Sequence, residues 1–268
     1  MRDTIQAAIA DMHVGSQHSV CADRFWNGLN NNTHSPNTDQ LYAISRFYNF
    51  ADALAKFREG RSLKLFLMGD MVEGVLLGTN EVWTNNPMEM SNVAIELLVD
   101  FKKRAKWRAG DLLYCLRGTY RHSEDWEEKI GEELGAEVGV NGKYSQDQWT
   151  VETNGKITWS IHQWVTAGVG ANEGNPIYNG LKNLYISSLK DLTRHPDNVY
   201  GAHFHRFGHS VYSWRSGTEV GVMQGTICPP FKGKDRFAAK VSKFEKNFIG
   251  GMMQLVTAGG VIDVPKFV

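Results

Sequence analysis

The chain has 268 residues, and its 29 lysines and arginines balance its 29 aspartates and glutamates, so the formal net charge at pH 7 is zero. A neutral protein has no long-range field that draws it as a whole onto nucleic acid, and any basic binding surface must be local. The length suits a single domain over residues 1–268 with a substantial core.

The cysteines and the N-terminus indicate the compartment. Cys21, Cys115 and Cys228 are too few and too widely spaced for a disulfide framework or a CxxC zinc site. The N-terminal segment lacks the long apolar stretch of a secretory signal, and no apolar run approaches the roughly 20 residues of a membrane span. We therefore expect a soluble cytoplasmic protein without a membrane partner, of unknown oligomeric state.

Strands and helices alternate in the first half of the chain. Residues 4–10 predict a strand, which a loop rich in Asn and Ser follows, and residues 41–58 predict an amphipathic helix. The apolar run 63–68 predicts a buried strand, the segment 88–106 a second helix, and the run 111–116 a further strand. A third helix is expected to start at Ser123.

Antiparallel hairpins dominate the second half. Segments 148–153 and 156–162 are rich in β-formers and are joined by Asn154-Gly155, the strongest short hairpin signal. A predicted helix at 177–194 precedes a strand-like run at 199–205. Hairpin-like runs follow at 211–224 and 252–264. This order favours an α/β fold with a mixed sheet core flanked by helices, in which ligands bind at the carboxyl ends of strands.

Two triplets after predicted strands carry paired donor groups. Asp11 and His13 form a D-x-H motif, and His203 and His205 form an H-x-H motif. On an extended strand, residues two apart point to the same side, so each pair can chelate one cation.

Two further donors end apolar strands singly. Asp70 follows the run 63–68, where a buried and unpaired carboxylate would be costly, and His162 ends the run 157–161. Oxygen and imidazole donors without a thiolate suit manganese, iron or zinc and, less well, magnesium.

Five motifs occur in order: D-x-H, G-D-x-x-E-G, R-G-T-x-x-H, a strand-end His and H-x-H. Over about residues 5–209 they resemble the calcineurin-like metallophosphoesterase superfamily, whose blocks are D-x-H, G-D-x-x-[DE], G-N-H-[DE], a single His and G-H-x-H. Segments 118–122, 229–232 and 249–251 are similar to small phosphoesterases encoded in phage genomes.

The resemblance implies a four-layer α/β/β/α sandwich of two mixed β-sheets flanked by helices. It also implies two divalent metal ions, manganese first, with iron, zinc or magnesium as alternatives. The implied ligands are Asp11, His13 and His205 for the first ion, His162 and His203 for the second, and Asp70 as the bridge.

The third block departs from the family's pattern. Thr119 stands where the family has an Asn ligand, and Tyr120 intervenes before any histidine. Thr119 could complete the second site through its hydroxyl or a bound water, whereas His122 could be the general acid or a metal ligand. Glu73 takes the position of an acidic residue that supports the site by hydrogen bonds without binding metal.

The expected reaction is hydrolysis of a phosphate ester by in-line attack of a metal-bridging hydroxide. We expect a phosphodiesterase or nuclease acting on DNA or a nucleotide, in the host cytoplasm if the chain is phage-encoded. The alternatives are a phosphomonoesterase, meaning a nucleotide or protein phosphatase, and a noncatalytic metal-binding interaction module.

Basic residues near the motifs are few. Arg117 and Arg121 flank the third block and could bind the substrate phosphate or stabilise the acidic rim. Lys232, Lys234 and Arg236 form only a modest basic cluster.

Overall fold

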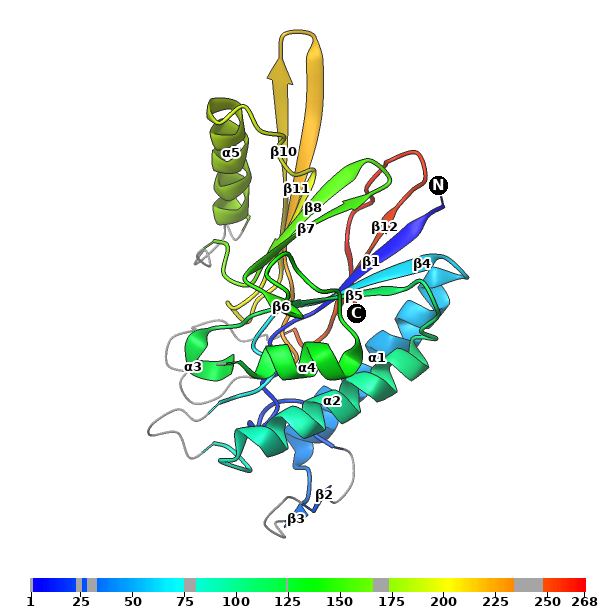
Figure 1. The fold of residues 1–268 in the computed structure, drawn as a ribbon, viewed down its shortest axis with the longest axis vertical. Helices are drawn as coiled ribbons and strands as arrows, with labels where there is room; N and C mark the ends of the chain where they lie inside the picture. Colours follow the sequence, from blue (N-terminus) through cyan, green and yellow to red (C-terminus); the bar gives the residue numbers. More distant parts are fainter. Residues whose placement is uncertain are drawn as a thin grey trace.

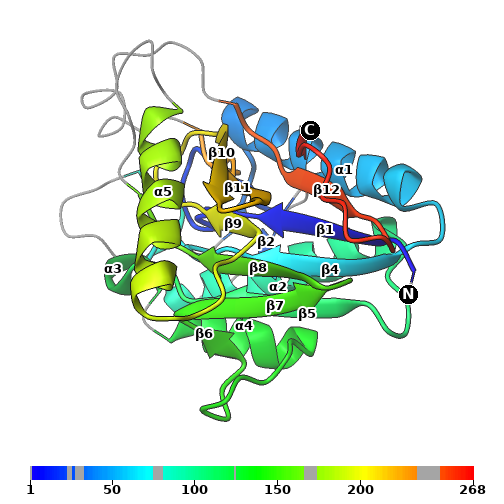
Figure 2. The same ribbon diagram turned by 90° about the horizontal axis from the view of Figure 1, so that it is seen from above.

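Two mixed β-sheets lie face to face, with helices on their outer surfaces (Figures 1 and 2). The computed structural model describes residues 2–22, 26–27, 33–74, 81–123, 125–165, 174–233 and 248–268. The four-layer α/β/β/α arrangement expected from the sequence is confirmed by the packing of these layers.

The first sheet contains the parallel strands of the first half of the chain. In spatial order its strands are β13 (Lys266–Phe267), β12 (Met252–Val256), β1 (Thr4–Ile9), β4 (Ser62–Leu67), β5 (Leu112–Leu116) and β6 (Ser145–Gln146). β1, β4, β5 and β6 are parallel, whereas β12 pairs antiparallel with β1 and β13 pairs antiparallel with β12 at the edge of the sheet. The predicted strands at 4–10, 63–68 and 111–116 are confirmed to within one residue at each end.

The second sheet is built mainly from hairpins. Its order is β10 (Gly208–Ser216), β11 (Glu219–Ile227), β9 (Asn198–Gly201), β8 (Lys156–Ile161) and β7 (Gln148–Thr153). β7 and β8 form the predicted hairpin, and Asn154 and Gly155 at its turn have φ of 52° and 77°. Positive φ at both positions is what a two-residue type I′ turn requires.

Helices cover the outer face of each sheet. α1 (Thr38–Arg58), α2 (Pro87–Arg104) and α4 (Trp126–Leu134) pack on the first sheet, and α5 (Asn175–Lys190) packs on β10 and β11 (Figure 1). None of the described helices combines the length and apolar composition of a membrane span.

The apolar core lies in three layers. Phe47 and Phe101 represent the layer between α1, α2 and the first sheet, Phe66 and Tyr200 the layer between the sheets, and Leu181 the layer under α5. The sequence periodicity of the helices therefore matches the faces that they bury.

The helix expected from Ser123 begins elsewhere. Ser123 is the last residue of the short helix α3 (Tyr120–Ser123), and α4 begins at Trp126. The fully buried Glu127 in the first turn of α4 accepts a hydrogen bond from the Met71 backbone N–H at 3.2 Å. A tertiary contact of this kind fixes the helix register in a way that capping preference does not show.

A buried arginine, Arg58, anchors the C-terminal end of α1. The Arg58 side chain is 1% exposed and its guanidinium donates to Asp111 Oδ1 at 2.8 Å. It also donates to the carbonyls of Arg61, Ala105 and Lys106. One side chain therefore joins the end of α1 to the turn after α2.

We expect Arg58→Met to lower the free energy of unfolding by about 3–5 kcal/mol, because it leaves the Asp111 carboxylate buried without its cation. Urea denaturation measures the loss. Arg104→Met is the control, since Arg104 is 45% exposed and pairs with Asp52 at 3.5 Å; an exposed pair contributes less than about 1 kcal/mol. Equal losses of unfolding free energy in the two variants would contradict this stabilising role of Arg58.

Candidate metal centre

The predicted donor residues lie in loops at the carboxyl ends of four strands. Asp11 and His13 follow β1, Asp70 follows β4, and His162 follows β8. The H-x-H triplet follows β9, two residues after its last residue, Gly201. The structure brings these loops together at one edge of the two sheets, as expected for ligand-binding groups in an α/β fold.

Backbone hydrogen bonds align the first two loops. His13 N donates to Asp70 O at 2.9 Å, Val14 N to Met71 O at 3.0 Å, and Glu73 N to Val14 O at 2.9 Å. The loops after β1 and β4 therefore run side by side, and His13 comes to lie next to both Asp70 and Glu73.

The donor residues do not have the extended geometry expected of them. Five of the six predicted donors have left-handed backbones, with φ values of 48° at Asp11, 45° at His13, 51° at Asp70, 77° at His203 and 50° at His205. The expectation that strand alternation aims each pair is therefore wrong. Left-handed non-glycine residues are uncommon, and they cluster at functional sites whose surroundings hold the strain.

Two glycines allow the loops after β4 and β5 to touch. A Cβ on Gly118 would overlap the Asp70 carboxylate and backbone nitrogen. Gly69 has φ +92°, and a Cβ there would lie 2.8 Å from both Gly118 Cα and His162 Nδ1. The glycines of the G-D and R-G-T motifs are thus needed for close approach at the Asp70 carboxylate.

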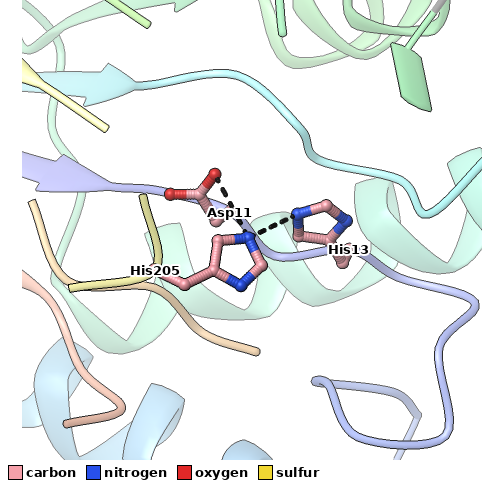
Figure 3. A group of neighbouring side chains, drawn as sticks. All are labelled: Asp11, His13 and His205. Atoms are coloured by element: carbon pink, nitrogen blue, oxygen red, sulfur yellow. Dashed lines mark hydrogen bonds and ion pairs between the residues drawn. The ribbon is translucent and has the colours of Figure 1, made fainter. Parts of the chain in front are cut away.

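The first donor cluster contains Asp11, His13 and His205, with one ligand atom from each within 4.8 Å of the others. His13 Nε2 lies 3.0 Å from His205 Nε2, and His205 Nε2 lies 3.8 Å from Asp11 Oδ1 (Figure 3). Asp11 and His13 are buried, whereas the His205 side chain is 22% exposed.

The second donor cluster contains Asp70, His162 and His203. Asp70 Oδ2 lies 3.1 Å from His162 Nε2 and 3.9 Å from His203 Nδ1. The same oxygen lies 3.9 Å from His13 Nε2 of the first cluster. The Asp70 carboxylate is therefore placed between the two clusters.

These residues fit divalent metal ions. Asp11 Oδ1 and His203 Nδ1 are buried and have no hydrogen-bond partner among the described residues, and such groups are costly to bury. Atoms bound to one ion at about 2.1 Å lie about 3 Å apart, close to the 3.0 Å between His13 Nε2 and His205 Nε2. The mixed carboxylate and imidazole donors suit the metals expected from the sequence.

Burial and mutual contacts shift the donors' pKa values. Burial raises the pKa of Asp11 to about 7. Burial also opposes ionisation of Asp70, but the hydrogen bond with His162 and the nearby imidazoles of His203 and His13 hold the pKa of this carboxyl well below its usual range. For His162 burial is opposed by the hydrogen bond to Asp70, which raises its pKa to about 9.

Metal binding is therefore expected to release protons and to weaken as the pH falls. Asp11, with a pKa raised to about 7, and His162, with a pKa raised to about 9, must both lose their protons to bind a cation. Between about pH 8 and about pH 6 we expect manganese affinity to fall about tenfold or more. Titration calorimetry at the two pH values measures the change in affinity, and its repetition in two buffers of different ionisation enthalpy measures proton release. Binding without proton release would contradict the assignment of Asp11 and His162 as ligands.

Thr119 contacts the Asp70 carboxylate. Its backbone N–H and its hydroxyl donate to Asp70 Oδ1 at 2.7 and 3.1 Å. The structure therefore places Thr119 so that it orients Asp70, and the role of Thr119 as a metal ligand stays a prediction.

His122 lies beside the first cluster. Its Nδ1 is 2.6 Å from the carbonyl oxygen of Glu73, and its ring centroid is 4.7 Å from that of His13. A carbonyl only accepts hydrogen bonds, so Nδ1 carries the proton and Nε2 is left for other chemistry. His122 also forms a donor group with His13 and Glu73.

Glu73 has a partner that the sequence did not indicate. Its Oε2 lies 2.8 Å from His13 Nδ1, and both of its oxygens accept from Lys232 Nζ at 2.9 Å. Burial alone would raise the pKa of Glu73, but His13 and Lys232 lower it to about 2. Of the modest basic cluster predicted from the sequence, Lys232 is 3% exposed and paired with Glu73, whereas Lys234 and Arg236 lie outside the described residues.

Arg117, one of the two arginines beside the third block, is paired on the protein surface. The Arg117 guanidinium lies 3.3 Å from Asp147 Oδ1 and 3.4 Å from Ser145 Oγ, on the β6 side of the loop. The Arg121 side chain lies outside the described part of the chain.

No protein-family model and no curated protein matches this chain. Solved structures match it weakly over nearly its whole length. An archaeal phosphodiesterase is 10% identical over 98% of this chain and 99% of its own, with a TM-score of 0.38. A predicted phosphoesterase from Streptococcus pneumoniae is 7% identical over 100% and 98%, with a TM-score of 0.35.

A third similar structure is larger. The NAD nucleotidase of Haemophilus influenzae is 9% identical over 99% of this chain and 49% of its own, with a TM-score of 0.42. Likenesses with identities and TM-scores this low do not place the chain in a family.

Proposed function

We propose that the chain is a metal-dependent phosphoesterase that binds two divalent ions and hydrolyses phosphodiesters of DNA or nucleotides. The observation that carries this proposal is the position of Asp70, whose Oδ2 is within 3.9 Å of donors from both clusters. A carboxylate between two sets of donors is what a pair of adjacent metal ions requires.

When bound, two such ions would activate a water and neutralise the charge that develops at phosphorus. Asp11, His13 and His205 would hold one ion, and His162 and His203 the other, with Asp70 shared. Manganese is the ion to test first.

His122 is the proposed general acid. The Glu73 carbonyl fixes the Nδ1 proton, as the 2.6 Å contact indicates, so when His122 carries a second proton, that proton sits on Nε2 and is the one that would pass to the leaving oxygen. Its ring lies against His13 and hence close to the first cluster.

The charges of the described side chains beside the clusters favour a diester over a monoester. Arg117 and Lys232 are already paired with Asp147 and Glu73, and a diester carries one negative charge where a monoester carries up to two. The narrower similarity to phage-encoded enzymes stays a prediction.

Hydrolysis of bis-p-nitrophenyl phosphate and p-nitrophenyl phosphate with manganese tests the proposal. We expect faster turnover of the diester and loss of turnover with a chelator. Preference for the monoester would indicate the phosphomonoesterase. One tightly bound ion without turnover of either ester would indicate a noncatalytic module.

A further inference from the structure

A buried lysine ends a chain of contacts that leads to the first donor cluster. Lys232 Nζ lies 2.9 Å from both Glu73 oxygens, Glu73 Oε2 lies 2.8 Å from His13 Nδ1, and His13 Nε2 lies 3.0 Å from His205 Nε2. The side chains of Lys232, Glu73 and His13 are 3%, 6% and 2% exposed. Water therefore competes little for these contacts.

Backbone contacts on both sides of Lys232 fix its position. Phe231 N donates to the carbonyls of Ala10 and Asp11 at 3.1 and 3.2 Å, and Gly233 N donates to His18 O at 2.6 Å. Lys232 itself forms a β-bridge with Ser19. The segment that carries the lysine is thus tied directly to the loop that carries Asp11 and His13.

The two ring nitrogens of His13 face different groups, Nδ1 the Glu73 carboxylate and Nε2 the first donor cluster. His13 Nδ1 lies 2.8 Å from the negatively charged Glu73 carboxylate, which favours the proton on Nδ1 and leaves the lone pair of Nε2 for the first cluster. An acidic partner of this kind orients a metal-binding histidine and fixes its tautomer. Glu73 can do so only while its carboxylate stays in one orientation.

We propose that Lys232 is a positioning residue for the first metal ion, acting through Glu73 on His13. By holding both oxygens of a buried carboxylate, the ammonium stops Glu73 from turning away and balances its charge. This inference rests on the proposed function only in taking His13 as a metal ligand, and its readout is ion binding.

A buried ion pair that serves folding alone is the competing explanation. Lys156 provides the matched control, since its Nζ lies 2.9 Å from Asp197 Oδ1 in the second sheet. Lys156→Met removes the same group from an ion pair that lies away from the donor clusters and is more exposed, with Lys156 and Asp197 side chains 36% and 12% exposed.

The experiment measures manganese binding by calorimetry, and the visible spectrum of the cobalt-loaded protein, for wild type, Lys232→Met, Glu73→Gln, the double variant and Lys156→Met. We expect Lys232→Met to weaken one ion-binding step about 10- to 100-fold and to change the cobalt spectrum. Lys156→Met should leave both unchanged. In the Glu73→Gln background, loss of Lys232 should weaken binding no further.

Unchanged ion affinity in Lys232→Met, or additive losses in the double variant, would overturn the proposal. If Lys232→Met does not fold, the double variant is compared with Glu73→Gln alone, because the double variant buries no unpaired charge. Unequal ion affinities of these two variants would overturn the proposal. A wild-type chain that binds ions without hydrolysing either ester would refute the phosphoesterase, and the comparison of ion affinities among the variants would still test the role of Lys232. A wild-type chain that binds no ion would refute both the proposed function and this inference.

Discussion

Asp70→Asn is expected to lower turnover of bis-p-nitrophenyl phosphate with manganese about a thousandfold or more. The carboxylate is 1% exposed and lies within 3.9 Å of His13, His162 and His203. An amide has one acceptor oxygen and no charge, so it cannot serve both donor clusters. Loss of several kcal/mol of charge stabilisation corresponds to this change in rate.

The same substitution should also reduce the number of bound ions, which metal analysis after desalting measures. Asp147→Asn is the control, because the Asp147 side chain is 82% exposed and pairs only with a neighbouring arginine among the described contacts, at 3.3 Å. Circular dichroism checks that both variants fold. Two ions bound in Asp70→Asn at wild-type affinity would contradict the bridging role.

The sequence predicts the parts of the fold that local chemistry determines. The apolar strand β4, the periodic helix α1 and the Asn154-Gly155 turn all appear where they are expected. Each depends on side chains close in sequence. The two-residue strand β6 does not, because Ser145 and Gln146 pair with Cys115 and Leu116 of β5 and have no strand pattern of their own.

The sequence predicts which donor residues come together, but not the geometry in which they do so. The motif order brings Asp11, Asp70 and His162 to one edge as expected, because parallel strands end together. The left-handed backbone at five of the six donor residues cannot be predicted from the types of those residues. Only the position of Lys232, directly after the apolar segment 228–231, hints at its pairing with Glu73, from which it is 159 residues apart.

His122→Ala should separate a general acid from a metal ligand through the leaving group. For a dinucleotide, whose leaving alkoxide needs a proton, we expect turnover to fall about 10²- to 10⁴-fold. For bis-p-nitrophenyl phosphate the loss should be much smaller, because nitrophenolate leaves without protonation. Parallel assays on the two substrates measure the ratio.

A metal-binding His122 predicts a different outcome. Both substrates would lose turnover equally, and an ion-binding step would weaken, because a bound ion would activate the attacking water for either substrate. His195→Ala is the matched control, since His195 packs against the Tyr185 and Trp214 rings under α5 and should affect neither substrate. Full turnover of the dinucleotide by His122→Ala would rule out both roles, and the 2.6 Å contact with Glu73 would then be structural.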